Sequence, residues 1–234
     1  MLRVCALTVC AIFLAGPATA GCVVLLHGLA RTSTSMQVMA RALEADGHTV
    51  INRGYASRTA TIKDLADEAI PPAVAACGTE TTDFVTHSMG GILLRVWAED
   101  VGADQIGRVV MLGPPNQGSE LVDALQELAL FDTLNGPAGQ ELGTGEDATP
   151  LTLGAVDFDL GVIAGDRSLN PIYSGIIPGP DDGKVSVEAT KVEGMDAHLS
   201  LPVTHTFMMV NREVIAATRS YLATGAFPVE DRED

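Results

Sequence analysis

The chain has 234 residues, with 30 acidic residues against 14 lysines and arginines, so its formal net charge at pH 7 is −16. This length suits one domain with a sizeable hydrophobic core. The negative charge argues against binding to nucleic acids, whose phosphates would repel it. No apolar run after the first 20 residues approaches the length of a membrane span, so we expect no stable membrane insertion.

Residues 1–20, MLRVCALTVCAIFLAGPATA, are typical of a signal peptide. Arg3 precedes an apolar run, and the segment ends in Ala18-Thr19-Ala20, the small-x-small pattern that signal peptidase requires. The apolar run is too short to anchor the chain as a membrane-spanning helix. We expect cleavage after Ala20 and a secreted or periplasmic product.

Two cysteines, Cys22 and Cys77, remain after this cleavage. Disulfides persist in exported proteins, so one hypothesis is a bridge from the start of the first strand to the end of a later helix. The alternative is two buried thiols, and the residues alone do not choose between them. Lipidation of Cys22 is disfavoured, because the preceding residues lack the usual leucine and the cysteine runs straight into an apolar segment.

The remainder, residues 21–234, alternates between strand and helix patterns. Helical spacing is clearest in three segments: residues 33–46, a segment that begins at Thr61, and about residues 211–222. In the second segment, Pro71-Pro72 is expected to kink or split the helix. The buried strand patterns are CVVLLHG, HTVIN, TDFVT, RVVML and DLGVIAG. This alternation predicts an α/β fold with a mostly parallel sheet flanked by helices.

The pattern changes over residues 118–157. SELVDALQELALFDTLNG reads as one apolar-faced helix, and PAGQELGTGEDATP as a loop rich in glycine and proline. Surface insertions of this kind often cover a site, so the segment is a possible cap or lid. Its apolar residues Leu121, Val122, Leu125 and Leu128 suit the wall of an apolar binding pocket and ordinary core packing equally well.

Ser88 lies between a strand pattern and a helix pattern, in the stretch Thr86-His87-Ser88-Met89-Gly90. A nucleophilic serine on a strand-to-helix elbow needs small residues two positions before and after it. Gly90 satisfies this requirement, whereas Thr86 is larger than the usual glycine. The alternative is a serine that caps the following helix.

A nucleophilic serine needs a base, and in the chain order of such folds the acid and then the histidine follow the serine. His198 and His205 qualify. We prefer His205, because it lies in a loop just before the last helix, with His198 as the alternative. For the acid, Asp182 in the turn PGPDDGKVSV, expected before a strand, is preferred over Asp181 and over Asp166.

Hydrolysis through a serine also needs two backbone N–H groups to bind the developing oxyanion. Met89, directly after the serine, supplies one. Leu29, after the His-Gly pair that ends the first strand, supplies the other.

The stretches VVLLHGLARTSTSM, VTHSMGGILLR, VVMLGPPNQGSE, DDGKVSV and VTHTFMM resemble, in this order, the α/β-hydrolase superfamily, in particular its compact bacterial secreted esterases and lipases. The resemblance extends over essentially the whole of residues 21–234. It implies Ser88 as nucleophile, Asp182 as acid, His205 as base, and the amides of Leu29 and Met89 as the oxyanion hole.

The resemblance further implies hydrolysis of small-molecule or lipid acyl esters through an acyl-enzyme, with no cofactor. The scattered histidines lack metal-ligand spacing, so no metal site is expected either. Acyl transfer by the same residues and a catalytically silent binding protein remain the alternatives.

Overall fold

A computed structural model describes residues 20–128 and 130–228. The signal peptide predicted for residues 1–20 therefore lies, except for Ala20, outside the described residues. None of the helices described is long and apolar enough to cross a membrane.

Six parallel strands form the centre of the fold, in the order β2-β1-β3-β4-β5-β6. From β2 onward, each strand follows at least one helix in the chain, which is the alternation expected of layered α/β proteins. The strands are β1 (Cys22–Leu26), β2 (Thr49–Ile51), β3 (Thr82–His87), β4 (Ile106–Leu112), β5 (Leu160–Gly165) and β6 (Ala197–Leu201).

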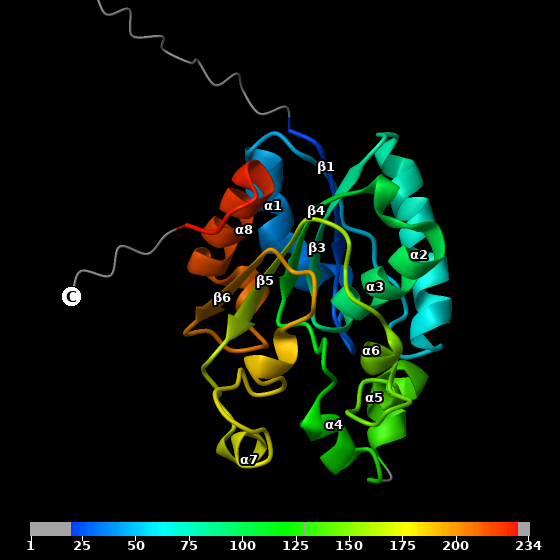
Figure 1. Ribbon diagram of the computed structural model, residues 1–234, viewed down its shortest axis with the longest axis vertical. Coiled ribbons are helices and arrows are strands. Elements are labelled where there is room, and N and C mark those ends of the chain that lie inside the picture. The colour runs from blue at the N-terminus through cyan, green and yellow to red at the C-terminus, as the bar shows by residue number, and fades with distance from the viewer. Residues whose placement is uncertain (1–19, 129, 229–234) are drawn as a thin grey trace, which may run out of the picture.

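Helices cover both faces of the sheet (Figure 1). The α-helices are α1 (Gln37–Ala45), α2 (Ile62–Cys77), α3 (Met89–Val101), α4 (Glu120–Leu125), α5 (Phe131–Gln140), α6 (Thr149–Thr152), α7 (Pro171–Ser174) and α8 (Arg212–Thr224). Short 3-10 helices are η1 (Ser33–Met36), η2 (Ala103–Gln105), η3 (Glu188–Thr190) and η4 (Met208–Val210). One apolar cluster lies under α2 and α3 and a second under α1 and α8, so the sheet is buried on both faces.

Four details differ from the sequence-based expectations. The segment expected as one helix after residue 118 is two helices, α4 and α5, and α5 has a kink at the non-helical Gly136 before it continues from Pro137 into the expected loop. Helix α2 continues through Pro71 and Pro72. The acid turn leads into the 3-10 helix η3 instead of a strand. The edge strand β6 had no clear strand pattern in the sequence, because most of its residues are only half-buried.

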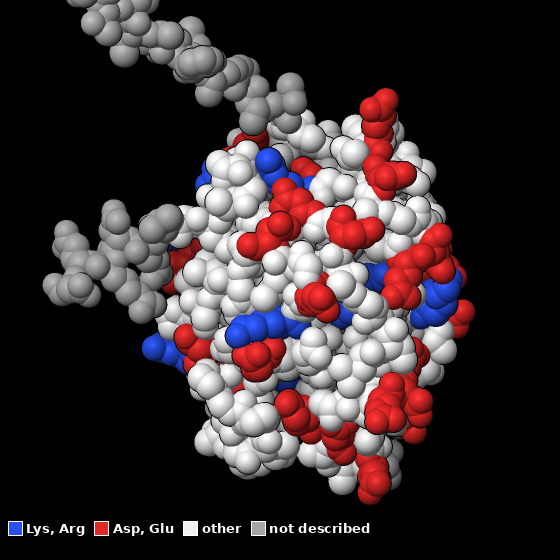
Figure 2. All heavy atoms as spheres, in the orientation of Figure 1, with Lys and Arg blue, Asp and Glu red and all other residues white. Residues whose placement is uncertain are grey.

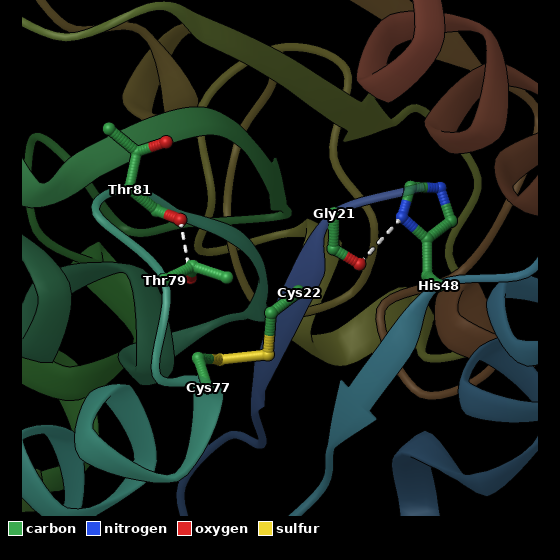
Figure 3. Close-up of a disulfide and its surroundings, with 6 residues drawn as sticks. All are labelled: Gly21, Cys22, His48, Cys77, Thr79 and Thr81. Atoms are coloured by element: carbon green, nitrogen blue, oxygen red, sulfur yellow. Dashed lines mark hydrogen bonds between the residues drawn. A yellow bond between two sulfur atoms is a disulfide. The ribbon is translucent and has the colours of Figure 1, made fainter. Parts of the chain in front are cut away.

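A disulfide joins Cys22 at the start of β1 to Cys77 at the end of α2 (Figure 3). Their Cα atoms lie 5.6 Å apart, within the range that a disulfide requires. The structure therefore confirms the disulfide hypothesis over the alternative of two buried thiols. The bridge ties β1, the second strand of the sheet, to the end of α2 across 55 residues of sequence.

Candidate active site

Ser88 occupies the tight turn between β3 and α3. Its φ of 54° and ψ of −127° lie in a region that non-glycine residues rarely adopt, and its side chain makes no capping hydrogen bond to α3. The Ser88 backbone N–H instead donates to the carbonyl of Leu112, 2.9 Å away, which holds the turn against β4. Ser88 therefore stands at the N-cap position without acting as a cap.

Two glycines, Gly90 and Gly91, lie in the first turn of α3, where the helix lies close to neighbouring strands and loops. A Cβ on Gly90 would lie 2.6 Å from the carbonyl oxygen of Leu26, so α3 can approach β1 only with glycine there. A Cβ on Gly91 would lie 3.2 Å from the Thr86 hydroxyl oxygen. Gly90 is therefore required by the close approach of β1, and Gly91 is in close contact with Thr86, Met111 and Pro114.

His205 and Asp182 form a buried pair. His205 Nδ1 lies 2.7 Å from Asp182 Oδ2, and the two residues are only 4% and 2% exposed. Because a carboxylate can only accept here, Nδ1 carries the hydrogen and Nε2 of the neutral ring is left with a lone pair. The His205 backbone N–H also donates to the carbonyl of Asp182, 2.9 Å away.

The other carboxylate oxygen of Asp182 is fixed by backbone groups. Asp182 Oδ1 accepts hydrogen bonds from the N–H groups of Lys184 and Val185, each at 2.9 Å. Asp181 instead accepts from the Ser174 hydroxyl and the N–H of Gly183. Of the acids considered from the sequence, Asp182 is the one in contact with His205.

The alternative residues lie elsewhere. His198 is on β6, where its Nε2 lies 2.9 Å from the Thr190 hydroxyl, and burial lowers its pKa. Asp166 is exposed and accepts a hydrogen bond from the Ser200 hydroxyl. Neither residue contacts the His205–Asp182 pair.

Ser88 and His205 line the same cavity, which has a volume of about 480 Å³. Leu29 also lines it, while Met89 is buried at the start of α3. Among the described residues, the backbone N–H groups of Leu29 and Met89 have no hydrogen-bond acceptor. Two non-glycine residues in the described part of the chain have positive φ, Ala30 and Ser88, and both line this cavity.

Helices α4 and α5 form one wall of the cavity, and Figure 1 shows them with α7 at the end of the sheet where the strands finish. The wall is apolar, and it includes all four residues whose role the sequence left open. The lining residues from this segment are Ser119, Leu121, Val122, Leu125, Leu128, Leu130, Phe131, Leu134, Asn135 and Leu142. Leu121 is buried, whereas Leu128, Leu130 and Leu134 are exposed at the rim.

Arg95 on α3 anchors both ends of this wall segment. Its guanidinium donates to the carbonyls of Asn116 and Pro150 and, through its second terminal nitrogen, to those of Leu153 and Gly154. The side chain is buried, no carboxylate of the described residues lies within 4.0 Å of it, and burial lowers the pKa of Arg95 to about 10. The carbonyl cluster takes the place of a counter-ion.

His87 is a part of the site that the sequence reasoning passed over. Its Nε2 lies 3.0 Å from the backbone carbonyl of His205, and its ring tilts against that of His205 at a centroid distance of 4.8 Å. Because a carbonyl only accepts, Nε2 carries the hydrogen, and burial lowers the pKa of His87 well below its usual value. His87 is thus a neutral donor that braces the His205 loop. Its position beside Ser88 was the available signal.

Each remaining histidine has a structural partner. His27 stacks on Tyr55 and donates from Nδ1 to the carbonyl of Gly28, while His48 Nδ1 lies 3.3 Å from the carbonyl of Gly21 (Figure 3). Across the part of the chain that the structure describes, no group of three or more His, Cys, Asp or Glu residues could hold a metal ion.

No protein-family model matches the chain, and no curated protein matches it. Among solved structures, it is similar to the lipase BlEst2 of Bacillus licheniformis at 18% identity. The propeptide form gives a TM-score of 0.73 over 91% of this chain and 52% of that one, and the mature form gives 0.66 over 90% and 94%. The chain thus spans about half of the propeptide form.

Two further structures are similar over most of both chains. A thermophilic esterase from Thermogutta terrifontis gives a TM-score of 0.60 at 14% identity, over 89% of this chain and 91% of that one. An extracellular α/β-hydrolase from a Paenibacillus species gives 0.56 at 16% identity, over 88% and 99%. Identities this low establish the fold alone.

Proposed function

The chain has the α/β-hydrolase fold, as the sequence motifs predicted, and within that fold we propose that it is a serine hydrolase of carboxylic acyl esters. The observation that carries the proposal is the buried His205–Asp182 pair, whose histidine lines one cavity with a serine on a strained strand-to-helix turn. Lipases and esterases among the similar structures support the same reaction class.

In the proposed reaction, Ser88 Oγ attacks the ester carbonyl carbon while His205 Nε2 takes the hydroxyl proton. The amides of Leu29 and Met89 donate to the oxyanion that forms. The bond to the alcohol oxygen then breaks, and His205 returns the proton to that oxygen. Water repeats the sequence on the acyl-enzyme and releases the carboxylic acid.

Asp182 keeps His205 ready for this role. Its carboxylate holds the hydrogen on Nδ1, so that Nε2 is the basic nitrogen, and it stabilises the imidazolium that forms when the proton is taken. The two backbone N–H groups on its other oxygen fix the orientation of the carboxylate.

The apolar wall from α4 and α5 suits the acyl chain, and the segment 118–157 acts as a cap over it in this proposal. We also propose that the protein is exported, after removal of a signal peptide ending at Ala20. The Cys22–Cys77 disulfide supports this, because such bridges persist in oxidising compartments.

A chain-length series of p-nitrophenyl esters tests the proposal, with wild type beside the variant Ser88→Ala. Wild type should hydrolyse at least part of the series, and the variant should lose roughly a thousandfold or more of kcat/KM. Turnover that survives in the variant would refute Ser88 as the nucleophile. Absence of turnover by the folded wild type on every ester would favour the binding-protein alternative.

A further inference from the structure

The cavity differs in charge from the rest of the molecule. Acidic side chains are spread over much of the face in Figure 2, consistent with the 30 acids of the chain. Among the described residues that line the cavity there is no Asp or Glu, and there are two cations, Arg31 and Lys184. The cavity beside Ser88 is thus locally positive in an acidic protein.

The two cations come from the two loops that build the proposed reaction centre. Arg31 lies two residues after Leu29, whose amide we assign to the oxyanion hole. Lys184 lies two residues after Asp182, and its backbone N–H donates to that carboxylate. The apolar wall comes instead from α4 and α5, so the charged and apolar parts of the cavity belong to different segments.

Neither cation is neutralised by the protein. Within the described residues, no carboxylate lies within 4.0 Å of the Arg31 guanidinium or the Lys184 ammonium, whereas Lys63, Arg108 and Lys191 each have such a partner. The Lys184 side chain is exposed where it lines the cavity. Partial desolvation and the charge of Arg31 lower the pKa of Lys184, and the charge of Asp182 acts in the opposite direction. The nearby carboxylate of Asp182 is already bound to His205 and to two backbone N–H groups.

We propose that Arg31 and Lys184 form an anion subsite, and that the preferred substrate is an acyl ester whose alcohol portion carries a phosphate or carboxylate close to the ester bond. The inference rests on the proposed ester hydrolysis. The acyl chain lies against the α4–α5 wall, and the anionic group of the alcohol portion lies between the two cations.

Electrostatic screening explains how such a substrate approaches an acidic protein. At physiological ionic strength the screening length is about 8 Å, so distant surface acids contribute little inside the cavity. Cations in direct contact with the anion dominate there, and a guanidinium can bind a phosphate or carboxylate through two parallel hydrogen bonds.

Matched substrates test the subsite. We would compare kcat/KM for the hexanoyl esters of glycerol and of glycerol 3-phosphate, and for the hexanoyl esters of propanol and of 3-hydroxypropanoate. Each pair shares its acyl chain, and the two pairs distinguish phosphate from carboxylate. Wild type should prefer the anionic member of at least one pair by roughly tenfold or more, about 1.4 kcal/mol, and added salt should reduce the preference.

Variants then assign the preference to the two side chains. Arg31→Gln and Lys184→Gln should each lower the ratio of anionic to neutral kcat/KM by about threefold to tenfold, and the double variant should bring it close to one. Both substitutions leave the backbone N–H of residue 184 in place, so its hydrogen bond to Asp182 is retained. Arg41→Gln, an exposed cation of α1 outside the cavity, is the matched control and should keep the wild-type ratio.

The outcomes separate this inference from the proposed function. Hydrolysis of both members of each pair at similar rates would overturn the anion subsite and leave ester hydrolysis intact. If no ester is hydrolysed, binding measured by calorimetry still tests the subsite. The two ligands are hexyl phosphate and the neutral control hexanol. The two proteins are Ser88→Ala and the same variant with Arg31→Gln and Lys184→Gln added. Binding of the phosphate that depends on the two cations supports the subsite, and equal or absent binding overturns it.

Discussion

Replacing Asp182 by Asn changes the hydrogen position on His205 while leaving the shape of the site almost unaltered. In the native site, Asp182 Oδ1 accepts from the N–H groups of Lys184 and Val185, and Oδ2 accepts from His205 Nδ1. The amide of Asn has only one acceptor oxygen. That oxygen must face the two backbone donors, because an NH2 group there would leave both N–H groups buried without acceptors.

The NH2 group of the variant then faces His205 Nδ1, so Nδ1 has to accept and the hydrogen moves to Nε2. A ring protonated on Nε2 cannot take the proton of Ser88. We expect kcat for ester hydrolysis to fall by about 10⁴-fold, the loss typical of a wrong histidine tautomer. This corresponds to about 5.4 kcal/mol of transition-state stabilisation.

The assay is hydrolysis of a p-nitrophenyl ester under saturating conditions, with the unfolding transition measured beside it to show that the variant folds. Asp181→Asn is the matched control, because Asp181 contacts Ser174 and Gly183 and not His205. It should retain kcat within a few-fold. A loss below tenfold in Asp182→Asn, or an equal loss in the control, would refute the reasoning.

Three further predictions concern stability. Reducing the Cys22–Cys77 bridge should lower the free energy of unfolding by about 4 kcal/mol, because the bridge closes a loop of 55 residues; urea denaturation with and without reductant measures this, and an unchanged midpoint contradicts it. Gly90→Ala should cost about 1–3 kcal/mol of unfolding free energy and most esterase activity, since its Cβ would meet the carbonyl of Leu26; full activity at native stability would show that the elbow can relax. Burial lowers the pKa of His87, so His87 stays neutral in the native state, whereas in the unfolded chain it gains a proton below about pH 6.5. The free energy of unfolding should therefore fall on acidification by up to about 1.4 kcal/mol per pH unit. His87→Gln should flatten that slope, and identical slopes in the two proteins would exclude His87 as the cause.

The positions of the candidate site residues could be predicted where they follow from chain order and from the type of element on either side. The strand before Ser88 and the helix after it placed the serine on a turn, and the late positions of Asp182 and His205 placed both at the same end of a parallel sheet. Choosing Asp182 over Asp181 was harder, since adjacent residues in one turn differ only in the direction of their side chains.

Other features depend on contacts between distant segments. The close contact between Thr86 and Gly91 crosses the turn from the strand to the helix. The role of His87 depends on a carbonyl 118 residues away in sequence. Sequence patterns within a short window predict neither of these two contacts.

The break between α4 and α5 was also hidden. Leu128 and Leu130 line the cavity beyond Leu125, where α4 ends, so the apolar spacing of the sequence continues past the end of that helix. The edge strand β6 was missed for the opposite reason, since a strand that is only partly buried lacks the continuous apolar run of a central one.

The central claim is that Ser88 becomes covalently acylated during turnover. The most direct measurement is peptide mass spectrometry after incubation with an organophosphate such as diethyl p-nitrophenyl phosphate, which traps an activated serine as a stable phosphoryl adduct. We predict one adduct, on Ser88, that forms in parallel with the loss of esterase activity and is absent from Asp182→Asn over the same time. Inactivation with the adduct on another residue, or esterase activity that persists when Ser88 is fully modified, would contradict the account.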